Sequence, residues 1–222
     1  MKQSKQDLLL QERLDYQLMN DSSDIIIDDY VITENELKEI HEKIINCDAF
    51  PFYKHTATKD IGIMVHVFTT RNSKEIFNEE YYQFFLNILI RFCDKNNIPI
   101  ERVYRSGINL GSENSTHKQT HPHVDLLVDE TYKKNGYKIA LIYLNDVSCD
   151  PGYNSTIVYK ERAPTNNYET TVLDMKDIKN LNVEREILPK KGRIVCFDGS
   201  RYHANYFSKG NEYRYVVVFN FI

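Results

Sequence analysis

The sequence predicts an α+β protein in which N-terminal helices pack on a β-rich C-terminal half. Amphipathic stretches with helical spacing occupy much of residues 1–98. From residue 99 onward, short β-rich runs follow one another with turn signals between them, which is typical of a sandwich or a barrel. No linker rich in glycine, serine or proline divides the chain. We therefore expect one domain over residues 1–222, with 1–98 as a helix-rich supporting region and 99–222 as the β core.

The supporting region is expected to contain three helices and two strands. The capping pair Thr33 and Glu36 marks the start of the second helix, because the threonine side chain and the glutamate three residues later can satisfy each other's backbone amides. In chain order the expected elements are helix Ser4–Met19, strand Ile25–Val31, helix Thr33–Asn46, strand Gly62–Phe68 and helix Ser73–Asn96.

The β core is expected to contain seven strands. Each is a short run rich in branched or aromatic residues that ends at polar or glycine-containing loops. These runs are Arg102–Leu110, His123–Val128, Tyr137–Asn145, Ser155–Lys160, Glu184–Leu188, Arg193–Phe197 and Tyr213–Ile222.

Composition limits the classes of protein to consider. The chain has 41% hydrophobic residues, so it is not disordered overall, and its net charge of −4 argues against a general polyanion binder without excluding one. No apolar run reaches the roughly 18–20 residues that cross a bilayer, and the N-terminus does not resemble a secretory signal. Four widely spaced cysteines without a CxxC pair indicate free thiols. We therefore expect a cytoplasmic protein with no membrane partner.

Three separate features of the β core could together bind a metal. In a strand, His123 and Asp125 project to the same face and can aim a nitrogen and a carboxylate at one point. His203 follows another strand, and Arg214 stands in an apolar one. Two histidines and one carboxylate form the facial triad of non-haem Fe(II) oxygenases, which leaves three positions open. A 2-oxo acid would fill two of them and O2 the third, while an arginine could hold the far carboxylate.

In order and spacing, these residues and the segments around them resemble the 2-oxoglutarate/Fe(II)-dependent oxygenases, in particular the prolyl-4-hydroxylase-like branch. The matching segments are His123-Val-Asp125, Ile142-Tyr-Leu-Asn-Asp146, Gly192-Arg-Ile-Val-Cys-Phe197, His203 and Arg214-Tyr215. The resemblance covers about residues 100–222. It implies a double-stranded β-helix, which is a jelly-roll or cupin-like barrel, supported by the N-terminal helices.

The resemblance also implies roles for individual residues. His123, Asp125 and His203 would bind Fe(II), and Arg214 would hold the distal carboxylate of 2-oxoglutarate. Tyr143 would assist that arginine, although a purely packing role is the alternative. Asn109 could face the cosubstrate, although inward polar residues are often structural. An isolated reading of Arg214 as an edge charge facing solvent is also open.

The implied reaction is hydroxylation of an unactivated C–H bond, coupled to conversion of 2-oxoglutarate and O2 into succinate and CO2. Ascorbate is a candidate reductant. The expected substrate is a prolyl residue of a protein or peptide, and the alternatives are a free amino acid or another small metabolite. A non-enzymatic metal- or ligand-binding β-barrel is the competing class. The acidic charge and the absence of a second arginine after Arg214 argue against a nucleic-acid substrate. The sequence predicts no oligomeric state.

The chain departs from the family pattern in two places. The segment Asp150–Thr156 is a looser version of the usual Gly-Gly-x-Thr, and the chain stops directly after the arginine strand, so no C-terminal lid is expected. Access to the site would then depend on the loops Asn46–Lys59, Gly111–Pro122 and Ser148–Asn154.

Three other histidines lie outside the matching segments. His121 is expected at the rim of the pocket, His117 in solvent and His66 in a structural role.

Overall fold

The computed structural model describes residues 24–58, 61–69, 75–114, 116–125, 137–148, 150, 152–163 and 172–222. The predicted helix Ser4–Met19 and the second half of the predicted strand His123–Val128 lie outside these residues. None of the described helices is long and apolar enough to span a membrane. The elements are β1 (Ile26–Asp28), α2 (Glu34–Ile40), the π-helical turn η1 (His41–Ile45), β2 (Tyr53–Thr58), β3 (Ile61–Thr69), α3 (Glu79–Lys95), β4 (Val103–Gly111), β5 (Lys138–Tyr143), β6 (Thr156–Arg162), the 3-10 helix η3 (Met175–Asn180), β7 (Val183–Ile187), β8 (Ile194–Asp198), β9 (Arg201–Asn205) and β10 (Arg214–Phe221).

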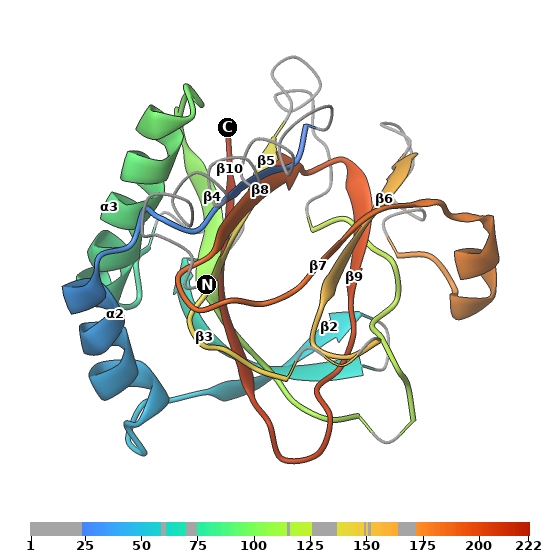
Figure 1. The fold of residues 1–222 in the computed structure, drawn as a ribbon, viewed down its shortest axis with the longest axis horizontal. Helices are drawn as coiled ribbons and strands as arrows, with labels where there is room; N and C mark the ends of the chain where they lie inside the picture. The colour runs from blue at the N-terminus through green and yellow to red at the C-terminus, as the bar shows by residue number, and fades with distance from the viewer. Residues whose placement is uncertain are drawn as a thin grey trace, which may run out of the picture.

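The strands form two antiparallel sheets that face each other, as in a jelly roll (Figure 1). The larger sheet has the order β1-β8-β5-β10-β4-β3-β2, and the smaller has the order β7-β6-β9. The larger sheet is open, with β1 and β2 as its edges, and in the described residues no strand joins either edge to the smaller sheet. The closed barrel expected from the resemblance is therefore wrong in this detail.

Strand β10 shows how the larger sheet separates two cores. Its side chains alternate between faces, as those of any strand do. Tyr215, Val217 and Phe219 pack toward the helices, whereas Val216 and Val218 join the core between the two sheets. The space between the sheets is therefore lined by every second residue of the central strands.

Helices α2 and α3 cover the outer face of the larger sheet (Figure 1). Helix α2 begins after Thr33, and the capping box with Glu36 is present as the sequence predicts. Helix α3 begins later than predicted because Asn78 provides its N-cap. It buries Phe85 and Phe92 completely, and each such side chain contributes about 1.5–3 kcal/mol by its removal from water.

The N-terminal region contributes more β-structure than expected. Its strands β1, β2 and β3 belong to the larger sheet. The predicted loop Asn46–Lys59 is wrong over Tyr53–Thr58, which is β2. The sequence Tyr-Lys-His-Thr-Ala-Thr shows no apolar alternation because this strand lies at a sheet edge, with Tyr53 exposed.

Strand β9 is also absent from the sequence-based expectation, which placed His203 shortly after the strand Arg193–Phe197 and in no strand of its own. The connection between β8 and β9 is a tight turn through Gly199. A Cβ atom at Gly199 would lie 2.0 Å from the ring of Tyr137, so only glycine fits there. This turn sends the chain from the larger sheet into the smaller one. In the described residues Cys47, Cys93 and Cys196 are free, as expected.

Candidate metal centre

Two histidines eighty residues apart in sequence face each other across a β-bridge. The amide of His123 donates to the carbonyl of His203, and the amide of His203 donates back, both at 2.9 Å. Such a doubly bonded pair holds two backbones at a fixed spacing. The two imidazole rings are 4.4 Å apart between centroids. His203 pairs on its other side with Val158, whose side chain lies in the core between the sheets, so both imidazoles face that space.

Asp125 completes the cluster with one of its two oxygens. Its Oδ1 lies 3.6 Å from Nε2 of His123 and 3.6 Å from Nε2 of His203. Its Oδ2 points elsewhere, accepting a hydrogen bond from Nδ2 of Asn220 at 2.9 Å and lying 3.6 Å from the guanidinium of Arg105. One ligand atom from each of His123, Asp125 and His203 lies within 4.8 Å of the others.

The backbone orients both imidazoles toward this common point. Nδ1 of His123 lies 2.8 Å from the carbonyl of His121, and Nδ1 of His203 lies 3.4 Å from the carbonyl of Arg201. A carbonyl only accepts, so each Nδ1 carries the proton and each Nε2 is left with a lone pair. This is the tautomer that a metal-binding histidine requires.

Burial and neighbouring charges set the protonation of His123 and Asp125. Burial and the neighbouring His203 lower the pKa of His123 to about 4, so its imidazole is neutral near pH 7. Burial alone would raise the pKa of Asp125, but the contact with His203 and the positive charge of Arg105 hold that pKa well below its usual value. A neutral His123 imidazole and an ionised carboxylate therefore meet in a buried place, next to the imidazole of His203.

This donor set fits a divalent transition-metal ion. Imidazole and carboxylate are the ligands of the facial triad that non-haem Fe(II) sites use. Two ligands at right angles are roughly 3 Å apart when each bond is about 2.1 Å, so separations of 3.6 Å require only a small closure of the side chains. The cluster has the spacing, protonation and burial that such an ion needs.

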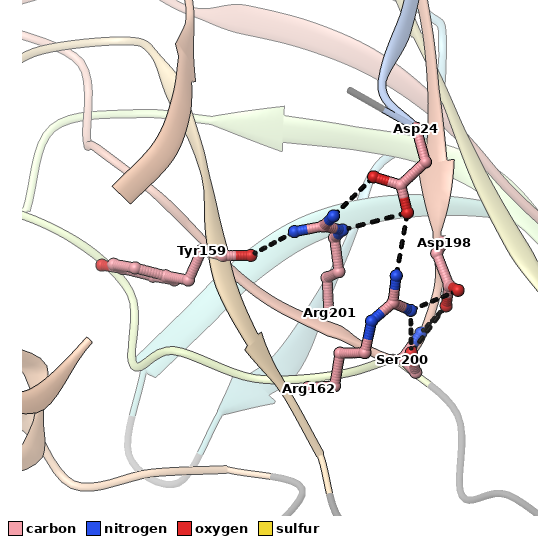
Figure 2. A network of polar contacts seen from close by, with 6 residues as sticks. All are labelled: Asp24, Tyr159, Arg162, Asp198, Ser200 and Arg201. Carbon is pink, nitrogen blue, oxygen red and sulfur yellow. Dashed lines mark hydrogen bonds and ion pairs between the residues drawn. The ribbon is translucent and has the colours of Figure 1, made fainter. Parts of the chain in front are cut away.

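A network of four charged side chains anchors the strand that carries His203 (Figure 2). Arg201, at the start of β9, binds Asp24 at 2.5 Å and donates to the carbonyl of Tyr159 at 3.2 Å. Arg162 of β6 binds the same Asp24 at 2.9 Å and also pairs with Asp198 at the end of β8. The network thus ties both sheets and the chain before β1 together, two residues away from His203.

Arg214 is a buried cation near the same space. It is the first residue of β10, is 7% exposed, and donates to the carbonyl of Asn154 at 2.5 Å. Burial lowers its pKa. Because the side chain is buried, the reading as a solvent-facing edge charge is wrong. No carboxylate of the described residues pairs with it, and a buried guanidinium without a counter-ion can bind an incoming carboxylate.

Tyr143 lies beside this arginine at the end of β5. Its hydroxyl donates to Oγ1 of Thr156 at 2.8 Å, and Thr156 in turn donates to Oδ1 of Asn205 at 2.9 Å. The positive charge of Arg214 acts on Tyr143, although burial has the larger effect and raises the tyrosine pKa. The phenol group therefore lines the space between the sheets and makes a buried hydrogen bond, so its role is not apolar packing alone.

Asn109 lies on the same face of the larger sheet as Tyr143. Both residues are directly opposite Val216 of β10, one from β4 and one from β5. Residues in register across neighbouring strands share a face. The three strands therefore place Asn109, Val216 and Tyr143 side by side toward the smaller sheet.

The other histidines behave differently from one another. His66 is buried, with Nδ1 at 2.8 Å from the carbonyl of Pro51, as expected for a structural residue. His121 is also buried, with Nδ1 at 2.9 Å from the carbonyl of Leu173, so the expected position at the rim is wrong. His117 is only half-buried. None of them is a member of the cluster of ligand atoms.

The sequence analysis did not identify Asn220 and Arg105 as residues that contact Asp125, although their positions in the strands give an indication. Asn220 is a polar residue in an apolar strand and stands six positions after Arg214, which places the two on one face. Arg105 stands four positions before Asn109 in β4 and pairs with Asn220 across the ladder.

Comparisons with known proteins agree with this geometry. No protein-family model and no curated protein sequence matches the chain. Solved structures do match. A 2OG-Fe(II) oxygenase-family protein from Burkholderia pseudomallei has 16% identity and a TM-score of 0.60, covering 94% of this chain and 90% of that one. A Trichoplax adhaerens prolyl hydroxylase in complex with a hypoxia-inducible-factor peptide has 13% identity and a TM-score of 0.57, covering 100% and 94%.

A third matching structure is that of an epimerase. The non-haem α-ketoglutarate-dependent epimerase SnoN from nogalamycin biosynthesis has 11% identity and a TM-score of 0.60, covering 97% of this chain and 84% of that one. At these identities the likeness establishes the fold. The chain therefore has the fold of the 2-oxoglutarate/Fe(II) oxygenases, and its structural neighbours include prolyl hydroxylases, as the resemblance implied.

Proposed function

We propose that this protein is a 2-oxoglutarate- and Fe(II)-dependent dioxygenase that hydroxylates an unactivated C–H bond. The observation that carries the proposal is the convergence of the Nε2 atoms of His123 and His203 on a single oxygen of Asp125. A protein that only binds a ligand has no evident need of two imidazoles and a carboxylate held in this way. The buried, uncompensated Arg214 supplies the second requirement, a receptor for a carboxylate.

Each residue has a distinct task in this proposal. When bound, Fe(II) with 2-oxoglutarate and O2 supplies the oxidation of the C–H bond, with succinate and CO2 as the other products. His123, Asp125 and His203 hold the ion on one side. Arg214 binds the distal carboxylate of the cosubstrate through paired donors, and Tyr143 keeps that end of the pocket polar and dry. Asn109 faces the same space from β4.

The proposed substrate is a prolyl residue of a protein or peptide. Support comes from the fold likeness to a prolyl hydroxylase in complex with a peptide. A free amino acid or another small metabolite is the alternative, and it is favoured by the equally strong likeness to an epimerase of natural-product biosynthesis. The retained carboxylate Asp125 favours hydroxylation, since the related halogenases have a small residue in that position. Ascorbate remains the candidate reductant.

The test is release of succinate from 2-oxoglutarate by anaerobically Fe(II)-loaded protein, in the presence of host-lysate proteins or metabolite fractions. Wild type should produce succinate, and mass spectrometry should find one added oxygen on the substrate. Asp125→Ala and His203→Ala should abolish both signals. Full activity in either variant would overturn the assignment. A gain of one oxygen on proline supports the peptide substrate, and a gain on a small molecule supports the alternative.

The competing proposal is a non-enzymatic barrel that binds a metal or small ligand. It predicts Fe(II) binding without succinate release from any substrate fraction.

We further propose that the chain is one oxygenase domain over residues 1–222, with 1–98 as its support, and that it works in the reducing cytoplasm. The free, buried thiols of Cys93 and Cys196 are consistent with that compartment.

A further inference from the structure

A buried amide stands directly behind the carboxylate of the candidate metal centre. Asn220 is completely buried in β10, and its Nδ2 donates to Oδ2 of Asp125 at 2.9 Å. Its Oδ1 is buried too and has no hydrogen-bond partner in the described part of the chain. An amide that is only half satisfied is a poor choice for packing alone, because an apolar side chain of the same size would avoid the unpaired oxygen.

The orientation of this amide follows from chemistry. A carboxylate oxygen accepts hydrogen bonds, and Nδ2 of Asn220 lies 2.9 Å from Oδ2 of Asp125. The group of Asn220 that faces it is therefore the NH2 group. The amide nitrogen fixes Oδ2 on the side away from the imidazoles, while Oδ1 faces both Nε2 atoms at 3.6 Å.

Arg105 strengthens this division of the two oxygens. It lies opposite Asn220 in the ladder between β4 and β10, and its guanidinium is 3.6 Å from the same Oδ2. The hydrogen bond from Asn220 and the ion pair with Arg105 therefore both involve Oδ2 of Asp125. The carboxylate is held in an asymmetric position from two adjacent strands.

We propose that Asn220 is a positioning residue that keeps Asp125 a one-oxygen metal ligand. Resting on the proposed function, this role matters because a carboxylate that turned both oxygens to the ion would occupy one of the three positions that the cosubstrate and O2 require. Arg105 assists from β4. Asn220 thus acts through Asp125 and touches neither the ion nor the cosubstrate.

The test uses Co(II) alone as the probe, titrated into the metal-free full-length protein and followed by its visible d–d absorption. Asn220→Leu keeps the volume and removes the donor, and Asn220→Ser removes the amide without adding bulk. Val218→Ala is the matched control, since Val218 lies on the same face of β10 and is buried in the core between the sheets. Thermal unfolding of each variant without metal records any general loss of stability.

Both Asn220 variants should bind Co(II) about 10–100-fold more weakly than wild type, which is the usual effect of losing a partner of a metal ligand. Their absorption bands should change in shape, and added 2-oxoglutarate should perturb them less. Val218→Ala should lose stability but keep the wild-type affinity and bands. Wild-type affinity and bands in both Asn220 variants would overturn the inference while leaving the proposed function intact. Failure of wild type itself to bind Co(II) would overturn both.

Discussion

Replacing Arg214 with methionine should stabilise the fold while removing the cosubstrate site. In the described structure the guanidinium is buried, has no carboxylate partner and makes one hydrogen bond, to the carbonyl of Asn154. Desolvation of an ion costs several kcal/mol, even after relaxation. Arg214→Met removes that cost, but it loses a charge-assisted hydrogen bond of about 1.5–3 kcal/mol and leaves a carbonyl unpaired at about 1–3 kcal/mol. The net gain in the free energy of unfolding should be about 1 kcal/mol.

Urea denaturation of the metal-free protein, followed by far-UV circular dichroism, measures this gain. In a chain of 222 residues it corresponds to a rise in Tm of roughly 2–4 °C. The same variant should bind 2-oxoglutarate at least about 100-fold more weakly, because two charge-assisted hydrogen bonds to its carboxylate are lost. Arg214→Lys is the control: it keeps the buried charge, so it should show no gain in stability. A loss of more than about 1 kcal/mol in Arg214→Met would show that the guanidinium serves the fold.

Three further changes test the local physics. The free energy of unfolding of the metal-free protein should fall by up to about 3 kcal/mol as the pH is lowered from 6.5 to 4. Burial lowers the pKa of His123 to about 4 in the folded protein, so the unfolded chain takes up the proton at a higher pH. His123→Gln should remove most of this pH dependence of the free energy of unfolding. Asn154→Ala should be about 1 kcal/mol less stable than Asn154→Gly, because both lose the amide and only alanine is strained at the φ of 61° seen there. Thr33→Ala should cost about 1 kcal/mol in urea denaturation by removing the N-cap of α2, and Thr33→Ser should restore it.

The cluster of candidate metal ligands could be predicted from the sequence, because a facial triad needs particular side chains. His123 and Asp125 are two apart on a strand-like run, and two such residues share a face wherever the strand goes. Arg214 was conspicuous because it interrupts an apolar strand. The types of these residues therefore indicated metal and carboxylate binding from the sequence alone.

The supports of the site could not be predicted in the same way. The role of Thr156 depends on the pairing of β6 with β9 and on its approach to Tyr143 from the opposite sheet. Strand β9 begins with Arg201, which reads as a polar loop residue but is held by ion pairs to Asp24, a residue far away in sequence. Strand β2 is polar because it is an edge. Long-range partners decide these features, and periodicity along the chain does not record them.

The bridge between His123 and His203 has a consequence for how the site is filled. Four backbone groups, not the ion, hold the two imidazoles together. The two candidate nitrogen ligands are thus brought together as soon as the strands pair. We therefore expect the metal-free protein to have a preformed site that can load, release or exchange a metal ion without unfolding, unlike small domains that fold only around zinc.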